Sequence, residues 1–393
     1  MTARRRLRVL LSVDRLGGLG GVETMSVMIA EALARQGHQI DIVYVQRVGA
    51  VPAFAHSASR VRALDVRLRR PFAALREILP VLVTGIRRRP DVIYVHRFEE
   101  LAFALPLHFL TGARIICHLH YFSPRSRVAL KSRGVAHFIA VSEATAKQWM
   151  TQGVDPTKVT VVPNGVDVDA FPLTGTDDRH GARLALRLPQ DAFVALFCGR
   201  VSPEKGVHDL VHAWAELGLP PDQARLLVVG VSSEGDANAL AYQGRLIALA
   251  ATGVEWLAAR LDVLTPMRAA DVLVLPSRVE SFGLVLAEAM STGLPIIATR
   301  VGGIPETVGA SGTLVADGDA AALVDALRRA AAGGQTQDAR RRALRQHVVD
   351  RLSLDATAQR IEQLLIDSAR PRRRWATHRR SADRRRQEIA RRS

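Results

Sequence analysis

The chain has 393 residues, of which 48% are hydrophobic and 23% are charged, so it is long and apolar enough to fold as two domains. Its net charge of +16 at neutral pH would attract anionic partners. The two cysteines, Cys117 and Cys198, lie inside apolar runs, which excludes a disulfide framework and favours a reducing compartment.

The first residues, MTARRRLRVLLSV, combine a basic start with an apolar run, as a signal peptide does. The apolar part is short, is interrupted by Arg8 and leads to Asp14 where a cleavage site would need small residues. We therefore expect residues 7–13 to form the first strand of a domain. No apolar stretch approaches the roughly 20 residues that span a bilayer, so we do not expect an integral membrane protein.

The first half of the chain alternates apolar runs typical of buried strands with helical patterns, which predicts a doubly wound parallel sheet. The expected helices include residues 22–36, closed by Gly37, and residues 71–87, which end before Pro90. The expected strands are residues 7–13, 39–45, 92–96, 114–117, 138–141 and 159–162.

Residues 171–189 lose this periodicity and are rich in Gly, Asp, Thr and Pro, which predicts an interdomain linker. A second α/β set follows, so we expect domains over residues 1–175 and 185–352. Its expected strands are residues 193–197, 226–229, 254–257, 272–275 and 296–298, and its expected helices are residues 207–217, 238–250, 282–292 and 320–331.

The positive charge is concentrated in clusters. Residues 370–393 hold eleven arginines against Asp383 and Glu388, a net charge of +9, and further clusters lie at residues 4–6, 67–70 and 87–89. The tail is poor in apolar residues, which predicts disorder, or a helix formed on binding. Arginine-rich codon usage would explain the tail equally well.

Arginine clusters suit anionic lipid or nucleic acid. Because three clusters lie in the first domain, we favour a cytoplasmic membrane surface, with the protein cytoplasmic and peripheral. Trp375 is the only aromatic residue of the tail, which disfavours stacking on single strands, so no nucleic-acid partner is expected.

The segment ESFGLVLAEAMSTGLPIIATRVGGIPET, residues 280–307, carries the strongest functional signal. Glu280 follows a predicted strand, and Glu288 lies two turns into the predicted helix. Ligands of open α/β sheets bind at this end of the strands, and the free N–H groups around Phe282 and Gly283 would attract an anion. An anion beside a hydroxyl-binding carboxylate suits a sugar nucleotide. The structural alternative is that Glu280 caps the helix and Glu288 faces solvent.

These residues closely resemble the donor-site signature of glycosyltransferase family 4, and the resemblance extends to about residue 367. It rests on five motifs in the family's order: GGVE at 20–23, VSEAT at 141–145, VVPNGVD at 161–167, FCGRVSPEKG at 197–206 and the Glu280–Glu288 pair. The resemblance implies the GT-B architecture, two Rossmann-like domains facing across a cleft, with a last helix at about 353–367 that returns to the first domain. It also implies retaining transfer from a nucleotide diphosphate sugar by a hexosyltransferase-type enzyme.

The glycine-rich loop before Glu23 also matches half of a dinucleotide-binding fingerprint. Glu23 occupies the third small position, where close helix–strand packing needs Gly or Ala. Asp41 lies near the start of its strand, where it would not reach a ribose. A dehydrogenase is therefore disfavoured, and the resemblance implies that the backbone at Gly20 and Gly21 approaches the donor diphosphate and the acceptor.

Arg200 and Lys205 follow the first strand of the second domain, in FCGRVSPEKG. A guanidinium fork and a compact ammonium both suit phosphate, although two such cations beside a turn are often only surface groups. No Asp-x-Asp stands in a plausible loop to hold a divalent ion. We therefore expect no metal and no cofactor, with the two cations stabilising the departing diphosphate.

The resemblance assigns further roles. Glu288 would bind the ribose hydroxyls, and Glu280 would bind hydroxyls of the donor sugar. A histidine that ends the strand at 114–117 would face the transferred sugar; we favour His120, but Tyr121 after it departs from the family's pattern and leaves His118 as an alternative. The remaining donor-binding residues would be Ser281, Phe282, Gly283 and Leu284.

Two motifs are expected to be structural. Ser142 is predicted to cap a helix with Thr145 three residues on, and Asn164-Gly165 predicts a turn with positive φ.

Other functions stay open. A different GT-B enzyme, such as a sugar-nucleotide epimerase or an inverting transferase, would share these motifs, and a nucleic-acid binder could use the tail.

For the favoured transferase, a glycan or lipid-linked acceptor of envelope or exopolysaccharide synthesis fits the basic first domain. The family carries a glycine near 257–259 where this chain has Leu257-Ala-Ala259, so the sequence does not fix the base or the sugar.

Overall fold

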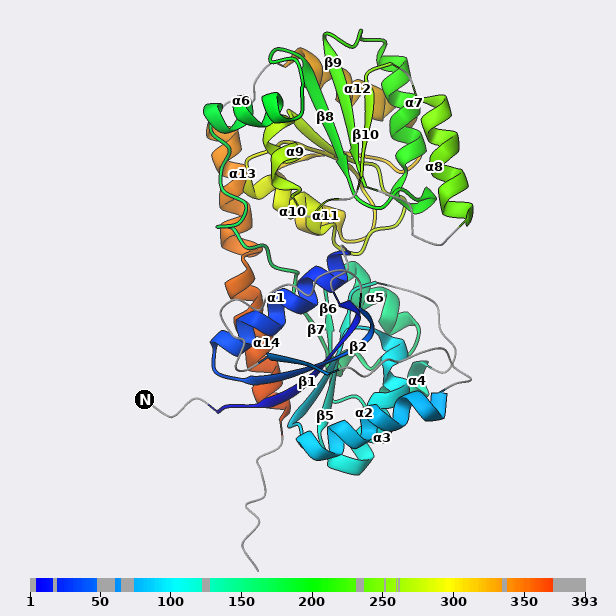
Figure 1. Cartoon of the computed structure of the whole chain (residues 1–393), viewed down its shortest axis with the longest axis vertical. Coiled ribbons are helices and arrows are strands. Elements are labelled where there is room, and N and C mark those ends of the chain that lie inside the picture. The colour runs from blue at the N-terminus through cyan, green and yellow to red at the C-terminus, as the bar shows by residue number, and fades with distance from the viewer. Residues whose placement is uncertain are drawn as a thin grey trace, which may run out of the picture.

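The computed structural model describes residues 5–16, 20–47, 61–64, 74–121, 128–230, 237–250, 252–258, 260, 262–333 and 338–369. These residues form two parallel sheets, each with helices packed against it, and one sheet lies above the other in Figure 1. The predicted α/β architecture of two doubly wound domains is confirmed. The predictions for the tail at 370–393, for the cluster at 67–70, for Arg4 and for Ala259 lie outside the described residues, as do residues 17–19 of the glycine-rich loop before Glu23.

The described part of the first domain contains a seven-stranded sheet in the order β3-β2-β1-β4-β5-β6-β7. The core order 3-2-1-4-5-6 is that of a Rossmann fold. The strand β3 was not predicted from the sequence. The strands are β1 (Arg8–Leu16), β2 (Gln39–Arg47), β3 (Val61–Leu64), β4 (Val92–Val95), β5 (Arg114–Leu119), β6 (His137–Ala140) and β7 (Val159–Val161).

The strands of this sheet are largely apolar in their central parts because helices cover both faces. In β1, Val9 and Leu11 pack with Met25 of α1, whereas Leu10 packs on the opposite face with Leu107 of α3. The helices of the domain are α1 (Gly21–Arg35), α2 (Ala74–Arg88), α3 (Leu101–Thr111), α4 (Val128–Ser132) and α5 (Glu143–Thr151), with 3-10 turns η1 (Phe98–Glu100) and η2 (Pro156–Lys158).

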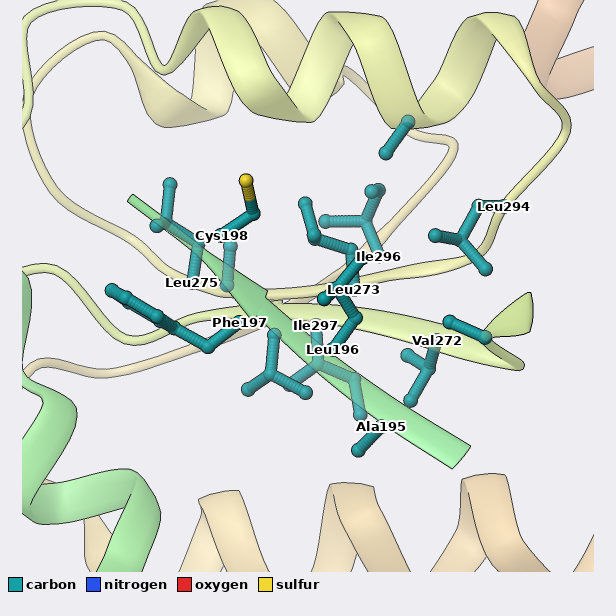
Figure 2. Packing of buried hydrophobic residues seen from close by; sticks show 14 of the residues in the cluster. Ala195, Leu196, Phe197, Cys198, Val272, Leu273, Leu275, Leu294, Ile296 and Ile297 are labelled. Carbon is teal, nitrogen blue, oxygen red and sulfur yellow. The ribbon is translucent and has the colours of Figure 1, made fainter. Parts of the chain in front are cut away.

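The second domain repeats this topology, with the described strands in the order β10-β9-β8-β11-β12-β13. Figure 2 shows side chains of three neighbouring strands, such as Leu196, Leu273 and Ile297, packed together between the flanking helices. The strands are β8 (Phe193–Cys198), β9 (Ala224–Val229), β10 (Val254–Leu257), β11 (Val272–Leu275), β12 (Ile296–Thr299) and β13 (Thr313–Val315). The helices are η3 (Pro203–Lys205), α7 (Val207–Leu217), α8 (Ala237–Leu249), α9 (Leu264–Ala269), α10 (Leu284–Ser291), α11 (Ile304–Val308), α12 (Ala320–Ala332) and α13 (Asp338–Arg351).

The predicted linker at 171–189 is not irregular throughout, because residues Thr176–Ala185 form helix α6, which packs against α9. Arg183 of α6 is fully buried, and its guanidinium pairs with Asp271 at 2.9 Å. The same guanidinium donates to the carbonyl oxygens of Ala269 and Ala192 at 3.0 and 2.8 Å. A buried arginine satisfied in this way fixes α6 on the second domain.

The chain passes between the domains twice, and the two passages are joined by hydrogen bonds. Val166 donates its N–H to the Leu352 carbonyl at 2.8 Å and accepts the N–H of Leu354 at 2.9 Å. Helix α14 (Leu354–Ser368) then packs against α1, as Figure 1 shows. A Cβ on Gly165 would lie 2.5 Å from the Leu354 Cα, so glycine is needed for this approach. The predicted positive φ at Gly165 was wrong.

A buried polar pair fastens α14 to the first domain. The Leu7 N–H donates to His38 Nδ1 at 3.1 Å, so the ring proton sits on Nε2, which donates to Glu362 Oε1 at 2.9 Å. Replacing Glu362 by leucine would leave that N–H buried without this acceptor. We expect the free energy of unfolding to fall by about 3 kcal/mol in urea denaturation. The exposed Asp367→Ala on the same helix serves as the control, and equal effects of the two changes would contradict the assignment.

Candidate functional site

The loops that follow β8, β11 and β12 lie side by side, because these strands are neighbours in the second sheet. In Figure 1, helices α10 and α11, which follow β11 and β12, lie at the edge of the second domain above α1 of the first. The motifs at 197–206 and 280–307 thus share one edge, as the sequence predicts. These loops form the candidate site.

Glycines allow the three loops to touch. A Cβ on Gly206, which has φ +65°, would lie 1.9 Å from the Pro276 carbonyl oxygen. A Cβ on Gly302, with φ +50°, would lie 1.8 Å from the Glu280 carbonyl oxygen, and that oxygen also accepts the N–H of Gly303 at 3.1 Å. Only glycine fits at Gly206 and Gly302, so these contacts set the position of the Glu280 backbone.

Lys205 and Glu280 form an ion pair between the first loop and the second. The Lys205 ammonium contacts Glu280 Oε2, with the side chains 20% and 14% exposed, and Glu280 Oε1 accepts the N–H of Ser281 at 3.1 Å. Arg200, in the same loop as Lys205, is exposed and lies outside this pair. The sequence predicts that Lys205 binds the diphosphate and that Glu280 binds hydroxyls of the sugar. The structure shows in addition that the two side chains pair with each other.

Helix α10 begins at Leu284, two residues later than predicted. Gly283 is its N-cap in the left-handed conformation, with φ +81°, and this conformation ends the helix on that side. Phe282 is buried, and its carbonyl accepts the Thr307 hydroxyl at 2.7 Å. Glu288 consequently lies little more than one turn into the helix, whereas the sequence predicted two.

Glu288 is half-buried behind this loop. Burial raises the pKa of Glu288 to about 7. The neighbouring thiol of Cys198, at the end of β8, has its pKa raised to about 12 by burial and by the charge of Glu288. The Glu288 carboxyl is thus poised between its neutral and ionised forms near neutral pH, and hydrogen bonds from a ligand would favour the carboxylate.

The first domain faces this loop with the N-terminus of α1. Gly20 is the exposed N-cap of α1, and a Cβ on Gly21 would lie 3.9 Å from the Leu284 Cβ across the interdomain boundary. The N-termini of α1 and α10 therefore approach each other, and each carries about half a positive charge. Two such helix ends favour an anion between them.

A second contact between the domains was not predicted. Glu306 of α11 accepts the N–H groups of Glu143 and Ala144, at the start of α5, at 2.7 and 3.0 Å. Ser142 caps the same helix as predicted, accepting the Thr145 N–H at 3.1 Å. The Glu306 carboxylate compensates the positive end of α5, so this contact stabilises the observed arrangement of the two domains.

His120 and His118 lie at the end of β5 beside His96, which the sequence analysis missed. His96 Nδ1 is 2.9 Å from His120 Nε2, and His118 Nδ1 is 2.7 Å from the Tyr94 hydroxyl. Burial lowers the pKa of His120 to about 3. Burial also lowers the pKa of His96 and of His118 well below the usual value, and the neighbouring histidines lower both further. The three rings are neutral at physiological pH.

No helix in the described ranges is both long and apolar enough to cross a bilayer.

Comparisons with known proteins agree with this geometry. Residues 19–170 match the sequence profile described as Glycosyltransferase Family 4, and residues 192–332 match that of the Glycosyl transferases group 1. A D-inositol 3-phosphate glycosyltransferase of Actinosynnema mirum is 32% identical over 356 residues, covering 80% of this chain and 84% of the relative. A protein of the same name, numbered 2, from Catenulispora acidiphila is 36% identical over 375 residues, covering 81% and 85%.

Solved structures share the fold. Anabaena HepE, crystallised with UDP and glucose, is 24% identical and superposes with a TM-score of 0.76 over 92% of this chain and 100% of its own. WaaG, a glycosyltransferase involved in lipopolysaccharide biosynthesis, is 18% identical with a TM-score of 0.67 over 91% of this chain and 99% of its own. The chain therefore belongs to glycosyltransferase family 4, the group 1 glycosyltransferases, and is a transferase enzyme with the GT-B fold.

Proposed function

We propose that the protein is a retaining glycosyltransferase that moves a sugar from a nucleoside diphosphate sugar to an acceptor hydroxyl. The observation that carries this proposal is the pairing of Lys205 with Glu280 beside the N-terminus of α10, opposite Gly21 of α1. A cation and helix N–H groups suit a diphosphate, and a carboxylate suits sugar hydroxyls. The UDP and UDP-glucose bound to Anabaena HepE support a donor of this class.

In the proposed reaction the bond between the anomeric carbon and the phosphate oxygen breaks, and its electron pair stays on the phosphate. Lys205 and Arg200 stabilise the negative charge that develops there. The acceptor hydroxyl attacks on the same face and passes its proton to the departing phosphate oxygen. Glu280, held by Lys205 and the Ser281 N–H, suits a hydroxyl-binding role better than that of a free nucleophile.

Product stereochemistry tests this mechanism. With an α-linked donor we expect an α-linked product, identified from the coupling constant of its anomeric proton in the NMR spectrum. A β-linked product would favour an inverting enzyme, and conversion of the donor sugar without transfer would favour an epimerase.

Metal independence is part of the proposal, because Arg200 and Lys205 supply the positive charge that a divalent ion would bring to the diphosphate. Transfer is expected to continue at an undiminished rate in excess EDTA. Activity that requires added Mg²⁺ would contradict this part of the proposal.

Two acceptor classes are proposed for the same reaction. A lipid-linked glycan of envelope or exopolysaccharide synthesis would suit an enzyme at a membrane. An inositol phosphate is the second candidate, because the two relatives described above carry the name of D-inositol 3-phosphate glycosyltransferases. Mass spectrometry of reactions offered both acceptors with one donor would separate the two.

We also propose that the first domain binds an anionic membrane surface through α2 and α3. A Cβ on Gly85 would lie 2.6 Å from a Leu107 side-chain atom, so the two helices pack closely. Their outer surface exposes large apolar side chains close to the basic run 87–89, and Phe109 is 81% exposed. Apolar residues beside arginines are typical of interfacial helices. The exposed apolar residues are Leu79, Val83, Ile86, Phe109 and Leu110.

Vesicle sedimentation tests this surface. Replacing both Phe109 and Leu110 by alanine is expected to reduce binding of the full chain to vesicles rich in phosphatidylglycerol. Leu249→Ala, which truncates a side chain of similar exposure in the second domain, is the control.

Deleting residues 370–393 tests the tail separately. Lost sedimentation with intact transfer would assign the tail to membrane binding, and loss of all function would favour the nucleic-acid alternative.

The raised pKa of Glu288 gives a pH dependence. If its carboxylate accepts the ribose hydroxyls, nucleotide affinity should rise by up to roughly tenfold per pH unit below about pH 7 and level off above it. The free energy of unfolding changes in the opposite direction. Because the folded state holds the Glu288 proton more tightly than the unfolded state does, this group stabilises the fold at low pH, and that stabilisation is lost as the pH rises through about 7. Calorimetry of wild type and Glu288→Gln checks both, since the variant should bind more weakly with little pH dependence. A variant with the wild-type profile would contradict the assignment.

A further inference from the structure

Three buried histidines gather at the ends of β4 and β5. In the parallel register Val95 of β4 is opposite Cys117 of β5, so His96 and His118 follow side by side and His120 lies two residues beyond, on the same face. The three side chains are 0–7% exposed. One ring nitrogen of each lies within 4.8 Å of those of the other two.

The ring nitrogens of this cluster are only partly satisfied. Within the described part of the chain, the Nε2 atoms of His96 and His118 are buried without a hydrogen-bond partner. His118 Nδ1 meets the Tyr94 hydroxyl at 2.7 Å, so with the proton on Nδ1 the Nε2 lone pair is free. A buried lone pair left unpaired, as at His118 Nε2, is rare and costly, which points to a ligand that accepts it.

We propose that His96, His118 and His120 bind one transition-metal ion, most readily Zn²⁺, through three ring nitrogens. Neutral imidazoles suit zinc and its neighbours in the first row, and sets of three histidines leave a fourth position for water or another ligand. The cluster offers nitrogen atoms alone, which disfavours Mg²⁺ and Ca²⁺, since both prefer oxygen.

The surrounding contacts suit such a site. Metal-bound histidines normally donate their other ring N–H to a fixed partner, and the Tyr94 hydroxyl is placed to be that partner for His118. The backbone of His96 is fixed as well, because its N–H donates to Glu100 Oε2 at 3.0 Å. His120 is the most exposed of the three rings, at 7%, and would leave the open position on its side.

Little movement is needed for coordination. Zinc–nitrogen bonds of about 2.0–2.1 Å in a tetrahedral site place the ligand atoms about 3.3 Å apart. His96 Nδ1 and His120 Nε2 are 2.9 Å apart and would separate slightly. The most distant pair, at up to 4.8 Å, would close by about 1.5 Å through ring rotation.

The site is distinct from the diphosphate-binding cations, since Arg200 and Lys205 belong to the second domain. Metal binding itself does not depend on the proposed transfer. One corollary rests on the proposed function: an ion on His120 would occupy the nitrogen that would otherwise contact the transferred sugar, so Zn²⁺ should inhibit transfer and a chelator should relieve the inhibition.

Cobalt titration tests the site directly. The full-length protein is stripped with chelator, dialysed and titrated with Co²⁺, and then Zn²⁺ is added in competition. We expect one equivalent to bind, with the intense visible absorption of four-coordinate Co²⁺, and Zn²⁺ to displace it. His118→Gln should abolish the band, and Tyr94→Phe, which keeps the ring and its packing, should weaken binding by about tenfold.

Two other histidines, His208 and His212, lie one turn apart on α7, with Asp209 3.0 Å from His208 Nε2, and could bind Co²⁺ at the protein surface. His212→Gln is therefore the matched control and should leave the band and the affinity unchanged. The proposal is overturned if His212→Gln removes the binding, if His118→Gln and Tyr94→Phe both bind with wild-type affinity, or if no four-coordinate Co²⁺ spectrum forms. Because the readout is a spectrum, failure of the transfer reaction would leave this result unaffected.

Discussion

Lys205→Ala is expected to lower kcat/KM for sugar transfer by about 10³-fold, equivalent to about 4 kcal/mol of transition-state stabilisation. The Lys205 side chain is only 20% exposed and lies at the end of a loop fixed by Gly206, so its charge acts in a partly desolvated position. It would stabilise the phosphate oxygen more strongly as negative charge develops on it. A mass-spectrometric transfer assay measures the loss.

The matched control is Arg328→Ala, which removes an exposed cation of α12 that pairs with Asp325 at 3.0 Å. Surface pairs of this kind contribute little, so activity should stay within about twofold of wild type. If Lys205→Ala lost no more activity than this control, the ammonium would have no role in the reaction.

Glu280→Ala is expected to lower kcat by about 10²- to 10³-fold while changing the affinity for the nucleoside diphosphate much less. The carboxylate would bind hydroxyls of the sugar, which the free nucleotide lacks. Its removal also frees Lys205 from its ion pair, so the ammonium becomes fully available to phosphate. Glu280→Gln, which keeps the acceptor oxygen but not the charge, should fall between alanine and wild type.

Transfer kinetics and nucleotide calorimetry on the same preparations separate these effects. Glu216→Ala, an exposed carboxylate on α7, serves as the control. Undiminished turnover in Glu280→Ala would remove Glu280 from the mechanism, and an equal loss of nucleotide affinity and turnover would assign it to binding alone.

The central elements of both sheets could be predicted because their residues are buried on two faces. The inner strand β11, which is buried along its length, has the predicted bounds. The edge strand β10 and helix α7 also have the predicted bounds, and α1 differs by one residue at each end. Apolar runs bounded by turn residues identify such strands without tertiary information.

Two short edge strands and one polar helix were missed because their pattern is weak. The strands β3 and β13 are only four and three residues long, and α6, TDDRHGARLA, is polar with a single buried arginine that supplies its main anchor. The start of α10 was wrong because Gly283 adopts a left-handed conformation that propensity does not reveal. In each case tertiary contacts decided the local structure.

The candidate site was predictable one loop at a time, since Glu280, Lys205 and the glycines each follow a recognisable strand. Their pairing was not, because Lys205 and Glu280 are 75 residues apart and meet only through the order of β8 and β11 in the sheet. His96 was missed for the same reason. It directly follows β4, and only the pairing of β4 with β5 places it beside His118 and His120. Glu306 acts across the two domains, and their arrangement leaves no local pattern in the sequence.

The most direct test of the account is calorimetric titration of UDP, GDP and ADP into wild type and Arg200→Glu. We propose that a nucleoside diphosphate lies between the N-termini of α1 and α10 and contacts the cations that follow β8. At least one nucleotide should therefore bind wild type in the micromolar range, about −8 kcal/mol, and the reversed charge should weaken that binding at least about tenfold. No heat of binding for any of the three, or equal affinity in the variant, would contradict it.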